Sequence, residues 1–459
     1  MDLFRKKTAD MMEDEGEHSG LKKKLRAIDL AALGIGSVVG TGIFVATGSA
    51  AQAAGPAVII SFILAALVSG FCALTYSELA TMFPVAGSTY SYSYVAFGEF
   101  IAWVIGWDLM LEYVVSASTV ASGWSSTLVA LLANYGVTLP TSITTSTLNG
   151  GIADIPAILI TLLVTWILYI GIKESANVNN IIVGVKIIVI LLFIFLGSTH
   201  INLTNFHPFA PFGWRGIMQG AALIFFSYIG FDAVSTAAEE TVNPKRDVPL
   251  GLVICLGVVI VLYVAIAFVL CGIVPFKSID ITDALPAALR SIGINWGGAL
   301  VATGAIIGMI STLLVTLYGQ IRIFMVMSRD GLLPPVFAKL HTNHKTPHIC
   351  TWITGIICAV LAGLFPLNVL IELCNIGTLF AFILVSVGVI ILRKTMPNIE
   401  RKFRCPWVPV TPIITVLLCL YFIVSLPPVT WLRFIIWLAG GSLLYFVYGF
   451  KHSSLNDVK

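Results

Sequence analysis

The chain has 459 residues, of which 58% are hydrophobic and only 11% are charged, and its formal net charge is +3. Soluble chains average about 25% charged residues. The composition therefore excludes a soluble globular protein and indicates a membrane protein with many spans. Residues 1–27 are polar and contain no apolar core of a cleavable signal peptide, so we expect a mobile N-terminal tail.

Twelve apolar runs of spanning length follow the tail, where a helix needs ~20 residues to cross a bilayer. In chain order they are 28–50, 58–82, 99–132, 154–172, 179–198, 215–240, 248–273, 294–326, 349–365, 369–392, 409–426 and 430–450. The third and eighth are longer than a bilayer requires and must tilt or protrude. We expect an all-α fold with five-span units at 28–198 and 215–392, two further spans at 409–450 and a C-terminal tail at 451–459.

The distribution of basic residues predicts the orientation. Most of the 26 Lys and Arg residues fall in segments on the same side as the N-terminus. The opposite side has Arg215, Lys277, Arg290 and Arg433. Because Lys and Arg accumulate in cytoplasmic loops, both termini are predicted to be cytoplasmic.

The first run contains the stretch GIGSVVGTGIF, residues 34–44, whose glycines weaken a helix. A break near Ser37–Gly42 frees N–H groups at the start of a second half-helix. Such N–H groups, together with the helix dipole, favour an anion such as a carboxylate. The alternative for this stretch alone is close helix packing through small residues.

The sixth run contains a second interruption, FFSYIGFDAVSTAAEE, with Gly230 and with Asp232 as a suitable N-cap. A break after residue 229 frees carbonyl groups that suit an ammonium group. The two breaks lie five spans apart, which gives the opposite orientations of an inverted repeat, and paired broken helices indicate a transport site at mid-membrane. Adjacent anion and cation sites match an α-amino acid.

Lys186 lies inside the fifth run, where a charge is costly and usually functional. It could extend along the helix toward the cytoplasmic surface, because Asn179 at that end is only seven residues away. Alternatively it points inward, where a buried amine can release and rebind a proton. We favour the second interpretation, with the proton as the coupling ion.

Asp108 and Glu112 are four residues apart on one face of the third run. They are candidates for proton coupling or for contact with a substrate, and the alternative is a satisfied polar pair between helices. Glu78 in the second run is equally ambiguous. Five further charged residues lie near the predicted cytoplasmic face. They could close an inner gate by forming ion pairs, or they could be part of a solvated surface: Glu239, Glu240, Lys245, Arg246 and Arg322.

Four motifs together resemble the amino acid–polyamine–organocation superfamily. They are the two interrupted stretches described above and two further stretches, YGQIRIFMVMSRDGLLP and RKFRCPWVPVTP. The chain is most similar to bacterial members of its cationic amino acid transporter family, over nearly its whole length. The resemblance implies a leucine-transporter-type fold, a 5+5 inverted repeat with spans 1 and 6 discontinuous plus two peripheral spans. It also implies that Lys186 replaces a sodium ion found in sodium-coupled members. By this resemblance, the substrate carboxylate would be bound by the backbone N–H groups of Val39, Gly40, Thr41 and Gly42. The substrate amine would be bound by the backbone carbonyls of Val38, Phe226, Ser227 and Ile229. Phe226 and Thr316 would line the pocket.

The sequence thus predicts a proton-coupled importer of L-amino acids in the plasma membrane, with neutral alanine-like substrates first and cationic ones open. The alternatives are an uncoupled facilitator or exchanger, and an amino-acid sensor with little transport. No catalytic constellation, metal site, nucleotide site or nucleic-acid surface is expected, so the expected partners are the substrate and the lipid bilayer. A small single-span subunit stays open.

Overall fold

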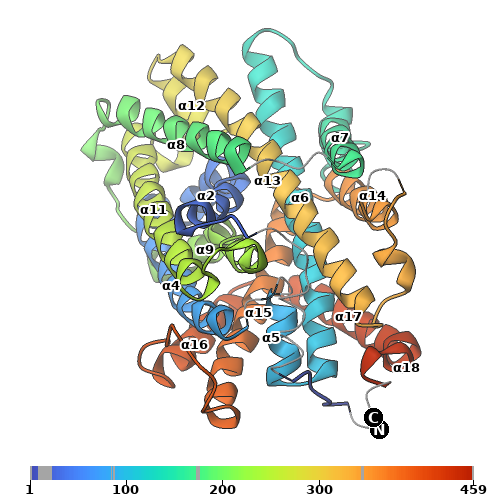
Figure 1. The fold of residues 1–459 in the computed structure, drawn as a ribbon. Coiled ribbons are helices and arrows are strands. Elements are labelled where there is room, and N and C mark those ends of the chain that lie inside the picture. Colours follow the sequence, from blue (N-terminus) through green and yellow to red (C-terminus); the bar gives the residue numbers. More distant parts are fainter. Residues whose placement is uncertain are drawn as a thin grey trace.

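The computed structural model describes residues 3–8, 23–83, 85, 88–171, 176–342 and 346–456. Within these ranges the chain is helical, and the single pairing of β type is an isolated bridge between Leu25 and Thr241. Figure 1 shows the helices gathered into one bundle. The chain is therefore an all-helical protein, as the composition predicts.

Eight helical stretches of the described chain are long and apolar enough to cross a bilayer, and four shorter apolar helices accompany them. The helices are α2 (Ala27–Val38), α3 (Thr47–Ala54), α4 (Val58–Met82), α5 (Ser88–Ala96), α6 (Glu99–Asn134), α7 (Ile155–Ile170), α8 (Ala176–Ser198), α9 (Gly213–Ile224), α10 (Ala233–Thr236), α11 (Pro244–Ile273), α12 (Ala284–Ser291), α13 (Asn295–Arg329), α14 (His348–Leu364), α15 (Leu367–Thr395), α16 (Val410–Val424), α17 (Pro428–Leu444) and α18 (Phe450–His452). Each predicted apolar run coincides with one helix, except that the first and sixth coincide with an interrupted series and the twelfth with α17, a π-helical turn and the start of α18.

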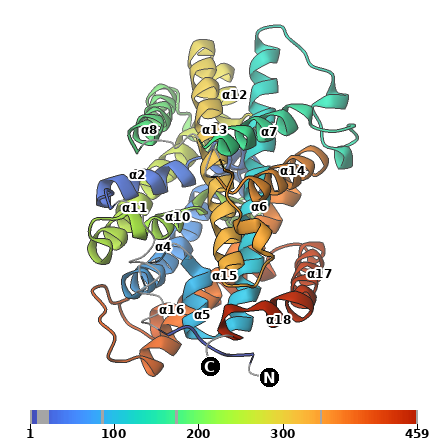
Figure 2. The same cartoon turned by 45° about the vertical axis from the view of Figure 1, so that its right-hand side comes forward.

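The helices α6 and α13 are the long central pair of the bundle. They contain 36 and 35 residues and pack along each other, as Figure 2 also shows. At 1.5 Å per residue each is roughly 50 Å long, more than the ~30 Å of a hydrocarbon core. Both therefore extend beyond the bilayer or cross it at a tilt. The helix α11 packs against α2 and α4, and α15 packs against α6.

Two helices were not predicted, because neither is an apolar run. The helix α5 has the sequence STYSYSYVA and is buried along its whole length. The helix α12 has only eight residues. Residues 3–8 also differ from the expected mobile tail, since the Glu99 N–H donates to the Arg5 carbonyl oxygen at 2.9 Å. Residues 9–22 of the predicted tail lie outside the described part of the chain.

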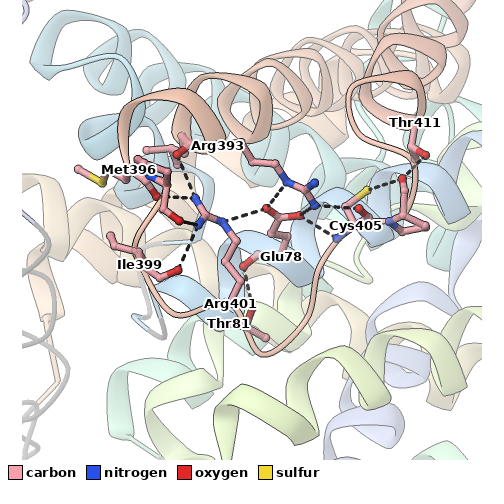
Figure 3. Close-up of polar contacts among 11 residues, drawn as sticks. Glu78, Thr81, Arg393, Met396, Ile399, Arg401, Cys405 and Thr411 are labelled. Carbon is pink, nitrogen blue, oxygen red and sulfur yellow. Dashed lines mark hydrogen bonds and ion pairs between the residues drawn. The ribbon is translucent and has the colours of Figure 1, made fainter.

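Glu78 of α4 lies at the centre of a polar cluster that attaches the loop between α15 and α16 to α4 (Figure 3). Its carboxylate accepts two hydrogen bonds from Arg393, at 3.0 and 2.7 Å, and one from the Cys405 N–H at 2.7 Å. Arg401 lies 3.3 Å from the same carboxylate and donates to the Leu392 and Met396 carbonyl oxygens at the end of α15. Glu78, ambiguous in sequence, thus has a structural role.

We expect Glu78→Ala to destabilise the protein, because it leaves the buried Arg401 side chain, 4% exposed, without its acidic partner. Removal of one partner from a buried ion pair costs about 3–5 kcal/mol. The measurement is the thermal unfolding midpoint of the purified protein in detergent. Lys245→Ala is the matched control, since its pair with Glu400 is open to solvent, with side chains 34% and 66% exposed, and exposed pairs contribute about 0–1 kcal/mol. Equal midpoints for the two variants would contradict the role of the cluster.

Candidate functional site

The first predicted break is present. The helix α2 ends at Val38, and Val39 has an extended backbone with φ −77° and ψ 93°. A π-helical turn, η1 (Gly42–Ala46), and then α3 continue the chain. Residues 39–42, the predicted carboxylate site, and Val38, predicted to bind the amine, are all buried. The glycines therefore coincide with a real interruption inside the protein.

The second predicted break is also present. The helix α9 passes into a short 3₁₀ turn, η6 (Phe225–Tyr228), and Ile229 is extended. Gly230 has φ +107°, a conformation that side chains rarely adopt. The chain resumes as α10, with Asp232 at its N-cap position. Asp232 makes no capping hydrogen bond, contrary to our expectation, and its carboxylate accepts one from the Tyr113 hydroxyl at 3.3 Å.

The two breaks lie against each other. A Cβ atom placed on Gly42 would be only 2.5 Å from the Ser227 Cα atom, and one on Gly230 would be 2.7 Å from the Ser37 Oγ atom. The chain just before α2 also pairs with the end of η7 (Ala238–Glu240), because the N–H groups of Lys24 and Leu25 donate to the Glu240 carbonyl. The interrupted segments therefore form one connected unit.

Several of the predicted backbone groups already have partners in this structure. The Val39 N–H donates to the Ile35 carbonyl at 2.9 Å. The Val38 carbonyl accepts from the Tyr263 hydroxyl at 3.1 Å, and the Phe226 carbonyl accepts from the Ile229 N–H at 3.2 Å. A carbonyl oxygen has two lone pairs and can accept a second bond, whereas the Val39 N–H can donate to a ligand only if it leaves Ile35.

Lys186 of α8 is fully buried and points to the first break. Its Nζ atom donates to the Gly36 carbonyl at 2.5 Å and to the Thr312 hydroxyl at 2.8 Å. The aliphatic stem passes Gly308 of α13, where an added Cβ would lie 3.0 Å from the lysine Cγ atom. The side chain thus ends among oxygen atoms at the break, not at the surface of the molecule.

Thr312 of α13 is a member of this cluster that the sequence analysis missed. Its hydroxyl lies within hydrogen-bond distance of the Gly36 and Val39 carbonyls, 3.2 Å from each, besides the Lys186 amine. The predicted pocket residue Thr316 stands one turn later, buried, and donates to the Thr312 carbonyl at 2.8 Å. The four-residue spacing from Thr316 was the available signal, because such residues share a helix face.

Asp108 and Glu112 are both buried on the side of α6 that faces α15. A Cβ added to Gly377 of α15 would lie 2.9 Å from an Asp108 carboxylate oxygen and 3.8 Å from the Glu112 Cβ atom. Among the described residues neither Asp108 oxygen has a hydrogen-bond partner. Asp108 is therefore not part of a satisfied polar pair, which was the alternative interpretation.

One of the expected ion pairs near the predicted cytoplasmic face is formed. Arg322 of α13 donates to the Glu240 carboxylate at 2.7 Å and to the Tyr318 hydroxyl at 2.9 Å. Lys245 instead pairs with Glu400 at 3.3 Å, and the Glu239 side chain lies outside the described atoms. The Glu240–Arg322 pair joins the second interrupted segment to the long helix α13.

Comparison with known proteins agrees with this architecture. The profile of the family described as "Amino acid permease" matches residues 25–444. The chain is 48% identical over 457 residues to the methylthioribose transporter of Bacillus subtilis, and 46% identical over 461 residues to the branched-chain amino acid permease BcaP of the same organism. Each of these alignments covers 99% of both chains. It is also 31% identical over 581 residues to the vacuolar cationic amino acid transporter 4 of Arabidopsis thaliana, over 99% of this chain and 96% of that one.

These relatives are transporters and not enzymes, and their alignments extend over the interrupted segments and the long helices. The chain is a multi-pass membrane protein that belongs to the amino acid permease family.

Proposed function

We propose that this protein imports neutral L-amino acids across the plasma membrane together with protons, by alternating access. The observation that carries the proposal is the position of the Lys186 amine, 2.5 Å from the Gly36 carbonyl at the break of the first span. A titratable amine inside a span is expensive. Its contact with the backbone of the candidate site links its protonation to the shape of that site.

The substrate would bind where the two breaks meet. Its carboxylate would be bound by N–H groups of Gly40, Thr41 and Gly42, with Val39 contributing if its present bond opens. Its amine would be bound by the carbonyls of Val38, Phe226, Ser227 and Ile229. In support, all of these residues are buried and the segments touch. A substrate between them requires that they separate, which is the local change that alternating access needs.

The side-chain pocket would be formed by Phe226 and Thr316, with Asp108 and Glu112 near it as further candidates for proton binding. Branched-chain amino acids are the leading neutral candidates, because two relatives are named branched-chain amino acid permeases. Cationic amino acids are the second candidates, because a plant and a human relative are named cationic amino acid transporters. No metal or nucleotide cofactor takes part in this scheme, and the coupling ion is the proton.

The proposed architecture has twelve spans, with two inverted units of five and two peripheral spans. The eight long and four shorter apolar helices support the number, and the matching breaks support the repeat. Both termini would be cytoplasmic, and the Glu240–Arg322 pair would close the passage on that side. A single-span subunit has no support among these observations.

A second candidate substrate is methylthioribose. The relative of that name is as similar to this chain as the permease BcaP of the same organism is, at 48% against 46% identity. Methylthioribose has neither the ammonium nor the carboxylate for which the paired breaks are suited. The two substrate classes can therefore be separated in one uptake assay with labelled leucine, alanine, arginine and methylthioribose.

We expect Lys186→Met to abolish the response of leucine uptake to an imposed proton gradient. The rate of uptake under the gradient should fall about tenfold or more. Methionine fills similar space without a titratable amine. The measurement is uptake into proteoliposomes with and without a gradient, and with and without sodium. Lys451→Met, at an exposed lysine of α18, is the control. Undiminished gradient-driven uptake in the Lys186 variant would remove this residue as the coupling group.

We expect Gly42→Ala to reduce uptake about tenfold or more, because its Cβ would stand 2.5 Å from the Ser227 Cα atom and backbone cannot yield easily. Gly70→Ala in α4 is the matched control, since no atom lies within 4 Å of its added Cβ. Both variants are assayed at equal amounts of folded protein, judged by gel filtration. Normal uptake in the Gly42 variant would show that the close approach of the breaks is dispensable.

A further inference from the structure

Two acids outside the candidate site are buried where α6 begins and α13 ends. Glu99, the first residue of α6, is completely buried and accepts hydrogen bonds from the hydroxyls of Tyr445, at 2.9 Å, and Ser453, at 2.6 Å. Asp330 directly follows α13 and accepts from the Tyr90 hydroxyl at 2.6 Å. Hydroxyl groups do not neutralise a carboxylate, so each acid needs a basic partner to remain charged.

The first described residues of the chain supply the basic partners. Arg5 donates to one oxygen of the Glu99 carboxylate at 2.9 Å, and its Nε atom lies 2.9 Å from the other oxygen. The Lys7 ammonium group donates to Asp330 at 2.8 Å, and its side chain is only 5% exposed. Both pairs connect the N-terminal segment to the ends of long helices.

Main-chain contacts attach the same segment. The N–H groups of Glu99 and Phe100, at the start of α6, donate to the carbonyls of Arg5 and Leu3 at 2.9 and 3.1 Å. They thereby satisfy donors that a helix start leaves open. Gly98, with φ +99°, leaves room for Phe4, since an added Cβ would lie 2.6 Å from the Phe4 carbonyl oxygen.

The Arg5 side chain keeps its positive charge in this position. Burial disfavours the charged form of Arg5, but its hydrogen bond and Coulomb attraction to Glu99 outweigh this effect and raise its pKa. The removal of Arg5 or Lys7 would leave a carboxylate buried without a counter-charge, which is far more costly than the loss of an exposed pair. Residues 3–7 are therefore held firmly on the ends of α6 and α13.

These two helices also hold the second interrupted segment on the same side of the site. The helix α6 carries Tyr113, which donates to Asp232, and α13 carries Arg322, which donates to Glu240. A change in the relative position of the two helix ends would therefore disturb both contacts.

We propose that residues 3–7 form a clasp that neutralises Glu99 and Asp330, fixes the ends of α6 and α13, and so favours the state in which the passage beside α10 and η7 is closed. The clasp is a feature additional to the proposed transport of amino acids. It rests on that proposed function only because it assumes that the region beside α10 and η7 is a passage for substrate. Its release would open the passage without touching the residues that bind substrate.

The test compares full-length variants in lipid nanodiscs by hydrogen–deuterium exchange with mass spectrometry. We expect Arg5→Gln with Lys7→Gln to speed exchange in residues 233–242 about tenfold, within the usual range of coupling between separate sites. Lys394→Gln with Lys451→Gln is the matched control, since it also removes two positive charges, from exposed lysines outside the clasp. It should leave exchange at 233–242 unchanged.

A quadruple variant adds Glu99→Gln and Asp330→Asn to the double variant. Because no buried charge then lacks a partner, exchange should return toward the wild-type rate. Slow exchange at 233–242 in the double variant would overturn the proposal. So would faster exchange confined to 88–100 and 325–333, because the clasp would then act only locally. A lower unfolding temperature with unchanged exchange at 233–242 would also overturn it.

Uptake assays separate the clasp from the proposed function. In proteoliposomes the double variant should change the ratio of substrate exchange to net uptake at least about threefold, since this ratio depends on how often the empty protein reorients. An unchanged ratio would contradict the clasp. If the wild-type protein transports no amino acid at all, the proposed function fails, but the exchange measurement still decides the clasp.

Discussion

The packing of a lysine amine against an open helix end is the constraint on which the centre of the molecule depends. A primary amine in an apolar interior needs oxygen partners, and a continuous helix offers no open carbonyl. The interruption at Val39 opens the carbonyls of α2, and α13 adds the Thr312 hydroxyl between Gly36 and Val39. Three segments from distant parts of the sequence are thus placed by one side chain, Lys186. The break, the threonine and the lysine have to be understood together.

Two buried acids outside this centre, Glu78 and Asp108, differ in whether nearby groups compensate them. Glu78 is surrounded by arginines and a backbone N–H from the loop that it holds, so its role is to fix a connection. Asp108 has no such partners among the described residues and lies where α6 and α15 approach closely through Gly377. Compensated acids fit permanent attachment, whereas an uncompensated one fits a position that moves or exchanges a proton.

Much of this organisation could be predicted from the sequence because membranes constrain sequences strongly. The apolar runs follow from composition alone, and both interruptions follow from glycines and an aspartate where a spanning helix should have none. Lys186 can be found from the sequence because it is a charged residue inside an apolar run. The carboxylate of Asp232, in contrast, accepts a bond from Tyr113 instead of capping α10, and only the approach of Tyr113 on α6 could reveal that.

Other features depend on contacts between distant segments and carry no local signal. Tyr263, which donates to the Val38 carbonyl, is one of two aromatic residues in α11, and nothing in the local sequence distinguishes it from Phe268. The helix α5 alternates serine and tyrosine, a pattern that resembles neither a spanning helix nor an amphipathic one. Arg5 and Lys7 belong to a polar, charged stretch whose composition indicates a mobile tail, and only the buried acids at the far ends of α6 and α13 explain why they are docked.

The pairing of Lys24 and Leu25 with the Glu240 carbonyl has a consequence for how such a protein can diverge. These bonds are formed by main-chain atoms, so they are indifferent to the side chains at the paired positions. The mechanical link between the two interrupted segments can therefore persist while the residues around it are replaced. Relatives could exchange one substrate for another by altering pocket side chains, and the two segments would still be joined at this point.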